Sequence, residues 1–350
     1  MNGMNKVSNA AASAPPAGLL GRLAGFMRDI FLRLGVLPFM LVIALVVFSL
    51  LSDQFLTTAN IVNLLRQSVY LILVSMGQML VLVTGGFDLS VGTVMALTSV
   101  VSAMAMRSLG GVIPDAGWIV MIAGCMCGLL AGLSVGLING IGVAFIGVSP
   151  FIVTLGLQSI GFGLALYLTG GVPVSGLPSE FSDLFGFGRL LGVPIPILVT
   201  AVCVAAIGIL MNRMPTGTHL LAVGGNAKAA ALSGINTRRV LLMAYLACAG
   251  LAAVSGLLLT ARVETGEANL GGTVALESIA ACVIAGVSLR GGIGRVPNVV
   301  MGAIFIGLVQ NGMNLASVGS YLQMVVLGTL LIVAVVADQI RHRMAVPGSH

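Results

Sequence analysis

Apolar residues occur in long runs along this chain, and charged or turn-forming residues separate the runs. Each run is close to the ~20 residues that an α-helix needs to cross a bilayer. The pattern lacks the ten-residue alternating segments of an outer-membrane barrel. It therefore predicts an all-α, polytopic membrane protein with about ten transmembrane helices. The expected spans are 34–52, 67–84, 91–107, 117–139, 150–169, 195–211, 240–261, 275–289, 297–315 and 320–338.

The composition supports this class of protein. Of the 350 residues, 58% are apolar and 7% are charged, and the mean hydropathy is +1.13. Because a soluble domain carries about 25% charged residues, this chain has too few charges to cover a water-exposed surface of its size. The 48 glycines have no three-residue period, which excludes a collagen. The net charge of +6 does not indicate a nucleic-acid partner in so apolar a chain.

The spans divide the chain into an N-terminal tail (1–33), a transmembrane domain (34–340) and a C-terminal tail (341–350). Basic residues precede the first span, and no small-residue cleavage site follows it. These features predict a retained span rather than a signal peptide that is removed. The loop 212–239 is the longest connection on the side of the termini.

The charge distribution indicates which way the chain points. With ten spans, both termini and every even-numbered connection share one side, which carries twelve of the sixteen Lys and Arg residues. These are Lys6, Arg22, Arg28, Arg33, Arg213, Lys228, Arg238, Arg239, Arg290, Arg295, Arg341 and Arg343. The other side carries Arg66, Arg107, Arg189 and Arg262 and the acids Asp53, Asp115, Glu180, Asp183, Glu264 and Glu267. Basic residues favour the cytoplasmic side, so we expect both termini there.

Motifs for enzyme chemistry are missing from the sequence. It has no G-x-x-x-x-G-K-[ST] phosphate loop, no G-x-S-x-G nucleophile elbow and no HExxH pair. Its five cysteines lie in apolar runs and its three histidines lack the spacing of metal ligands, so we expect no metal site and no catalytic residue. Ionisable residues are scarce inside the spans, which argues against a proton-driven carrier, although neutral carbonyls can bind sodium. We therefore expect a conduit that takes its energy from elsewhere.

Small residues recur along the fourth span. Gly124, Gly128, Gly132, Gly136 and Gly140 stand at every fourth position and form one ridge. Lipid gives helices no hydrophobic reason to associate, and small residues let their backbones approach closely. The ridge predicts a tight helix–helix contact; the alternative is that it lines a transport pathway.

An alanine-rich segment of the 212–239 loop predicts a short helix, with Asn226 as its N-cap and Gly234 in the left-handed closing position. The segment comprises Asn226, Ala227, Lys228, Ala229, Ala230, Ala231, Leu232, Ser233 and Gly234. A helix this short is marginal in water and needs a surface to pack against. That surface is either the protein's own helix ends or a cytoplasmic partner.

Two other turns lie on the same side as this segment, and each is either a structural turn or part of a cytoplasmic gate. Their candidate residues are Gly86, Asp88 and Ser90 in the first turn, and Arg290, Gly291, Gly292 and Arg295 in the second. Asp88 or Ser90 can also cap the third span. On the opposite side, 171–194 predicts a short helix capped by Ser179, which either lies in the membrane interface or contacts a soluble partner.

Seven blocks of sequence occur in order between Phe55 and Asp338. They are 60–67 (NIVNLLRQ), 85–92 (GGFDLSVG), 150–156 (PFIVTLG), 224–235 (GGNAKAAALSGI), 277–286 (ESIAACVIAG), 288–295 (SLRGGIGR) and 311–315 (NGMNL). Together these blocks resemble the permease subunits of bacterial ABC importers for ribose, xylose, galactose and related sugars.

The resemblance implies a ten-helix permease of the inner membrane that works as a dimer and receives a monosaccharide from a periplasmic binding protein. It also implies a separate cytoplasmic ATPase that binds ATP and Mg, with 226–234 as the coupling helix that enters a groove of the ATPase. Candidate pathway residues are Gln78, Gln158, Glu277, Gln310 and Asn311; for Glu277 the alternative is a role at a helix end. The rival functions are import of another solute (a branched-chain amino acid, a nucleoside or a sugar-like signal) and a secondary carrier or channel that works alone.

Overall fold

The computed structural model describes residues 37–345, and it confirms the all-α, polytopic class. Within these residues, seven helices are long and apolar enough to cross a membrane, and three shorter helices are also apolar. The seven are α3 (Thr58–Leu82), α4 (Val91–Val112), α5 (Gly117–Ile141) with its π-helical extension (Gly142–Ile146), α6 (Pro150–Thr169), α8 (Ile195–Arg213), α11 (Thr237–Val263) and α13 (Val296–Leu315). The three are α2 (Leu37–Leu51), α12 (Val274–Ile284) and the first part of α14 (Ser320–Ala345). The predicted tail 1–33 and residues 346–350 lie outside the described residues.

The ten apolar helices follow the predicted spans in order, but some of their ends differ. Helix α3 begins at Thr58, well before residue 67, because Asn60 and Arg66 make its first turns too polar to be recognised as part of a span. The Thr57 side chain caps this helix by accepting a hydrogen bond from Asn60 N at 3.3 Å. Helix α12 ends at Ile284 rather than at residue 289. Gly286, just beyond this end, takes a left-handed conformation (φ 81°) that stops the helix.

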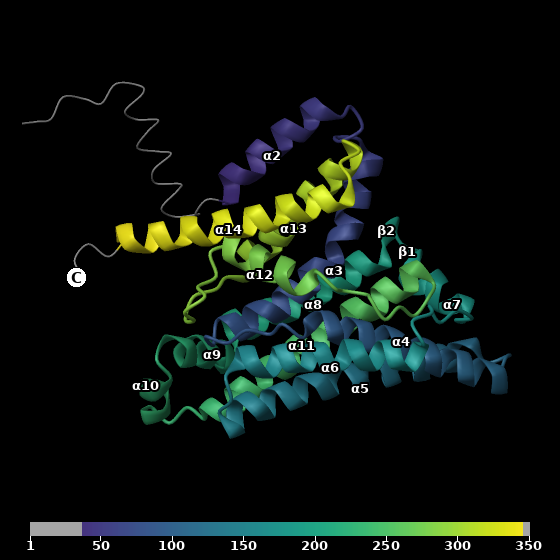
Figure 1. Ribbon diagram of the computed structural model, residues 1–350, viewed down its shortest axis with the longest axis horizontal. Helices are drawn as coiled ribbons and strands as arrows, with labels where there is room; N and C mark the ends of the chain where they lie inside the picture. Colours follow the sequence, from purple (N-terminus) through teal and green to yellow (C-terminus); the bar gives the residue numbers. More distant parts are fainter. Residues whose placement is uncertain (1–36, 346–350) are drawn as a thin grey trace, which may run out of the picture.

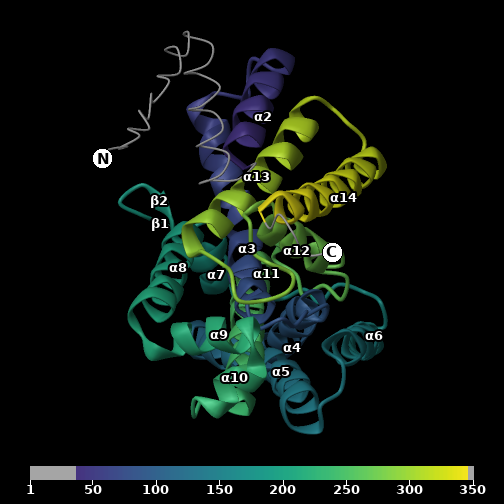
Figure 2. The same cartoon turned by 90° about the vertical axis from the view of Figure 1, so that its left-hand side faces the viewer.

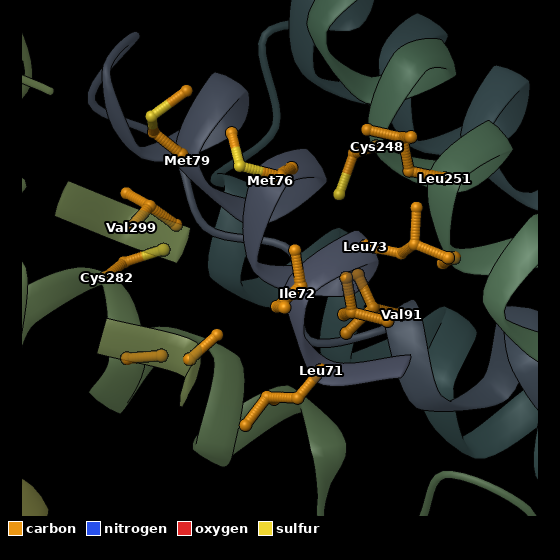
Figure 3. Close-up of a cluster of buried hydrophobic side chains, with 14 of the residues drawn as sticks. Leu71, Ile72, Leu73, Met76, Met79, Val91, Cys248, Leu251, Cys282 and Val299 are labelled. Carbon is orange, nitrogen blue, oxygen red and sulfur yellow. The ribbon is translucent and has the colours of Figure 1, made fainter. Parts of the chain in front are cut away.

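Helix α3 forms the centre of the molecule. Every residue from Ser68 to Leu82 is buried, as expected for a helix that is apolar on all sides. Figure 3 shows its side chains between Cys248 and Leu251 of α11 on one side, and Cys282 of α12 and Val299 of α13 on the other. The remaining apolar helices pack around this core.

Helices α11, α12, α13 and α8 contact α3, and α4 and α5 pack against α11. Helices α6 and α8 lie at opposite edges of the molecule (Figure 2). Few residues of these two helices are buried: 17% in the most apolar stretch of α6 and 22% in that of α8. Most of each helix therefore faces outward. These outward faces are apolar and suit lipid or a neighbouring subunit.

The two ends of the bundle carry different connections (Figure 1). One end carries the short helices α9 (Pro215–Gly225) and α10 (Ala227–Leu232). The other end carries α7 (Ser179–Phe181), a π-helical turn (Ser182–Gly186) and an antiparallel hairpin of β1 (Arg189–Leu190) and β2 (Val193–Pro194).

The predicted short helix of 171–194 exists as α7 and its π-helical turn, but its cap differs from the prediction. Pro178, not Ser179, is the N-cap. Phe181 is fully buried in a cluster with Met106, Val120, Met121 and Ala261. The segment is thus anchored in the helix bundle through Phe181.

Candidate functional site: three turns that meet at one end of the bundle

Helix α10 projects from the end of the bundle as a small exposed knob. The Asn226 side chain caps it by accepting a hydrogen bond from Ala229 N at 3.0 Å, and Gly234 follows it with φ 84°. Ala230 is buried and holds the helix to the protein, whereas Leu232 is 91% exposed. Of the predicted segment 226–234, every residue except Ala230 is exposed.

Helix α9 leads into α10 and was not among the elements predicted from the sequence. Pro215 at its start and Gly225 at its end are typical of helix boundaries and were available as a signal. Leu220 and Val223 bury one face of α9 against the bundle. The knob therefore stands on a packed helix rather than on a loose loop.

A cluster of glycines joins α9 to the other two turns at this end. Gly292 N donates a hydrogen bond to Val83 O at 2.8 Å. A Cβ placed on Gly224 would overlap Val83 O and lie 2.7 Å from Gly292 N. A Cβ placed on Gly291 would lie 2.7 Å from Gly224 O and 2.9 Å from Gly85 N. Three connections that are far apart in sequence thus meet backbone to backbone, at separations that exclude any side chain.

The turn before α4 is held by a buried polar network. Asp88 Oδ1 accepts hydrogen bonds from Ser90 N at 2.9 Å and from Ser90 Oγ at 2.6 Å. Asn139 Nδ2 of α5 donates to Ser90 Oγ at 2.7 Å, and Tyr245 of α11 donates its hydroxyl proton to Phe87 O at 3.2 Å. The network therefore fastens the turn to two neighbouring helices.

The cap of α4 differs in detail from the expectation. Ser90 occupies the N-cap position, but its side chain makes no capping hydrogen bond, because it donates to Asp88 and accepts from Asn139. Asp88 is completely buried, and burial raises the pKa of its carboxyl above the ordinary value. The hydrogen bonds from Ser90 act in the opposite direction without cancelling this effect.

The turn 288–295 presents positive charge beside the knob. Ser288 Oγ accepts a hydrogen bond from Arg290 N at 3.2 Å, and Ser288 N donates to Ile293 O at 3.0 Å, which closes the turn. Arg290 and Arg295 are exposed. Lys228, Arg238 and Arg239 are exposed around α10. This end of the bundle is therefore cationic.

The glycine ridge of α5 contacts two helices in turn. Near the far end, Gly124 lies against Met106, and Gly128 lies against Thr98 and Ser102, all of α4. A second group lies nearer the knob: Gly132 lies between Thr98 of α4 and Ala253 of α11, Gly136 against Ala249 and Gly140 against Leu242. The ridge is where α4, α5 and α11 approach most closely.

Comparison with known proteins identifies the family. Residues 60–335 match the family described as branched-chain amino acid transport system / permease component. The chain belongs to this permease family. No solved structure matches it significantly.

Several relatives of this permease are named sugar import permeases. It is 38% identical to the ribose import permease protein of Bacillus subtilis, over 86% of this chain and 92% of that protein. It is 36% identical to the D-allose transport system permease protein of Escherichia coli, over 86% of this chain and 90% of that protein. It is 33% identical to the galactose/methyl galactoside import permease protein of Haemophilus influenzae, over 89% and 95%.

The five candidate pathway residues of the permease lie in different environments. Gln78 is completely buried in α3, and Asn311 of α13 exchanges two hydrogen bonds with Asn60, at 2.9 and 3.0 Å. Gln158, Glu277 and Gln310 are partly exposed. Part of each of these three side chains thus lies at the surface of the chain.

Glu277 lies in the first turn of α12 and borders a groove. Its Oε1 accepts a hydrogen bond from Thr273 Oγ1 at 2.7 Å. The groove, of about 130 Å³, runs between α12, α13 and α14 and is lined mainly by apolar side chains such as Leu276 and Met324. Glu277 therefore combines a position at a helix N-terminus with access to an open groove.

Proposed function

We propose that this permease is the membrane subunit of an ABC importer that passes a monosaccharide across the bacterial inner membrane. The observation that carries the proposal is its similarity, over most of its length, to permeases named for ribose, allose and galactose. In this assignment the chain is not itself an enzyme. A separate ATPase binds ATP and Mg and hydrolyses the ATP.

The knob formed by α10 is the proposed coupling element for that ATPase. It is small, apolar at Leu232 and surrounded by exposed cations, which suits a groove with an acidic rim. The helix α9 that carries it contacts the end of α3 and the turn 288–295 through Gly224, Gly291 and Gly85. A displacement of α10 would therefore move the cytoplasmic ends of several helices together.

The proposed orientation places α10 in the cytoplasm. The exposed cations at this end agree with the preference of basic residues for the cytoplasmic side. In this orientation both tails, 1–33 and 341–350, are cytoplasmic, the transmembrane domain is 34–340, and 212–239 is the coupling loop. The end that carries α7 then faces the periplasm and the sugar-binding protein.

A second copy of the permease, or a related permease, is the proposed neighbour in the membrane. Large apolar side chains remain exposed along α6 and α14, for example Ile160, Tyr167 and Tyr321. The groove beside Glu277 opens between α12 and α14. A pathway between two copies would place Glu277, Gln158 and Gln310 near the solute.

A different solute is the second candidate, because the family description names branched-chain amino acids. The deciding experiment reconstitutes the permease in vesicles with the ATPase and the binding protein encoded beside it. Uptake of labelled ribose, allose, galactose and leucine is then measured with and without ATP. We expect uptake of a sugar that needs ATP. Uptake of leucine alone would favour the second candidate, and ATP-independent uptake by the permease alone would refute the ABC assignment.

A further inference from the structure

Three of the four arginines on the side of the bundle opposite to α10 gather at one place. The Arg66 guanidinium of α3 lies over the Phe187 ring, 5.2 Å from its centroid, and donates a hydrogen bond to Gly186 O. Arg262 and Arg189 are close enough to repel its charge. Arg262 itself lies over the Tyr70 ring, 5.9 Å from the centroid. We call Arg66, Arg189 and Arg262 the arginine cluster.

The cluster has no acidic partner within the part of the chain that the structure describes. The neighbouring groups that act on the charge of Arg66 are Arg262, Tyr70 and Arg189, and no carboxylate is among them. Arg66 Nε is buried and makes no hydrogen bond. Two of the six acids of this side have other neighbours: Glu180 lies over Gly117 at the start of α5, and Glu267 Oε1 accepts a hydrogen bond from Thr265 Oγ1 at 3.3 Å.

Positive charge gathered without compensation is unfavourable, and unpaired arginines favour an anion from outside the chain. The planar guanidinium forms paired hydrogen bonds with phosphate or carboxylate oxygens. The cluster is therefore suited to an anionic ligand that the chain itself does not supply.

The hairpin next to the cluster has the character of a membrane-inserted segment. Leu191 at its tip is 97% exposed, and Phe187, Leu190 and Val193 are also exposed. The hairpin extends sideways from the bundle beside α8, rather than capping its end (Figures 1 and 2). A solvated tip of this kind would expose several apolar side chains to water, whereas in a bilayer the same side chains are buried.

The depth of Arg66 leaves its side chain within reach of the headgroup level. It lies eight residues into α3, about 12 Å from the start of the helix at 1.5 Å per residue. Helix α3 has 25 residues, so at 1.5 Å per residue it is about 7 Å longer than the ~30 Å hydrocarbon core. If this whole excess projects on the side of Arg66, the Arg66 backbone lies about 5 Å inside the core boundary, and its long side chain can extend outward to the lipid phosphates.

We propose that the arginine cluster binds the phosphate of an anionic phospholipid, with the apolar tip of the hairpin inserted among its acyl chains. In the orientation proposed above, the lipid lies in the outer leaflet. The site itself does not depend on the transported solute. A soluble acidic partner is less suitable, because it would not bury Leu190 and Leu191 in an apolar environment and would have to reach Arg66 below the end of α3.

The test uses the full-length permease purified from vesicles of phosphatidylcholine with and without phosphatidylglycerol, and native mass spectrometry counts the lipid retained. We expect the wild type to retain phosphatidylglycerol in preference to phosphatidylcholine. Arg189→Gln and Arg262→Gln should each retain it about fivefold less well, the effect of losing one cation near an anionic surface. Arg107→Gln is the matched control, because Arg107 is the fourth arginine of this side and is not part of the cluster. It should behave as the wild type.

Two further arms separate a lipid from other anions. Leu191 has a left-handed φ of 52°, which asparagine tolerates, so Leu191→Asn should fold normally and still lose phosphatidylglycerol. Inorganic phosphate should not displace the lipid. Equal retention by the wild type and both arginine variants would overturn the proposal. So would full displacement by phosphate, or a loss of binding-protein affinity in Arg189→Gln without any change in lipid retention.

Discussion

At the scale of single residues, Asp88 shows most clearly how burial affects the protonation of a side chain. Its carboxyl is enclosed between α4, α5 and α11, and its Oδ1 accepts two hydrogen bonds from Ser90. A buried carboxylate without a cation strongly favours its neutral form. The raised pKa of Asp88 follows from this burial.

The pH dependence of stability tests this account of Asp88. A group whose pKa is higher in the folded than in the unfolded protein stabilises the fold at low pH, and this stability is lost as the pH rises through the folded-state pKa. Asp88→Asn, which mimics the neutral acid, should therefore abolish that part of the pH dependence. Asp88→Ala should lose about 1–3 kcal/mol at all pH values, because it leaves Ser90 without its acceptor. Thermal unfolding in detergent across a pH series measures both. Identical pH profiles for the wild type and Asp88→Asn would contradict this account.

Two adjacent glycines provide a matched pair at the knob. In Gly224→Ala the new methyl group would collide with Val83 O and Gly292 N, whereas in Gly225→Ala it would meet nothing within 4 Å. We expect Gly224→Ala to reduce ATP-driven uptake several-fold and to lower thermal stability, since overpacking typically costs about 1–3 kcal/mol. Gly225→Ala should leave both unchanged. Equal uptake and equal stability of the two variants would show that the close contact of the three turns is needed for neither property.

At the scale of elements, local signals in the sequence predict helices well, and contacts between distant segments explain what it misses. Helix α10 follows from Asn226, the alanines and Gly234, which are adjacent in the chain. The burial of Phe181 depends on residues of α4, α5 and α11 that no local pattern reveals. The first turns of α3 carry polar residues that pair with other elements, such as Asn60 with Asn311.

The glycine ridge of α5 gives a testable prediction about the packing of helices. A Cβ on Gly132 would lie 2.7 Å from Thr98 Oγ1 and 2.8 Å from Ala253 Cβ, so Gly132→Leu should force α4 and α11 apart. We expect a loss of stability above the usual ~1–3 kcal/mol of overpacking, with little folded protein recovered. Gly208→Leu on α8 is the control, because Gly208 has open space around it. Size-exclusion profiles and thermal unfolding compare the two. Normal assembly of Gly132→Leu would contradict the tight contact.

At the scale of the whole molecule, charge and hydropathy predict the number of apolar helices and how the connections divide between the two ends. The sequence alone does not reveal that the turns at 85–90, 224–226 and 288–295 meet, because glycine contacts leave no side-chain pattern to recognise. It also does not separate Gln78, which is enclosed in the core, from Gln158, which is accessible, since both are amides within apolar runs. The assignment of pathway residues therefore stays a prediction.

The exposed face of α10 offers the most direct test of energy coupling. Leu232 is exposed while its neighbour Ala230 is buried, so Leu232→Asp should leave the fold intact and place a charge at the proposed contact with the ATPase. Val112→Asp is the control, because Val112 is also largely exposed and lies at the opposite end of the bundle.

The decisive measurement is sugar uptake by vesicles that contain the permease with its ATPase and binding protein. We expect ATP-dependent uptake that Leu232→Asp abolishes, together with loss of the ATPase from the purified complex, while Val112→Asp retains the ATPase. Unchanged uptake by Leu232→Asp, or equal uptake without the ATPase, would contradict the proposed coupling role of α10.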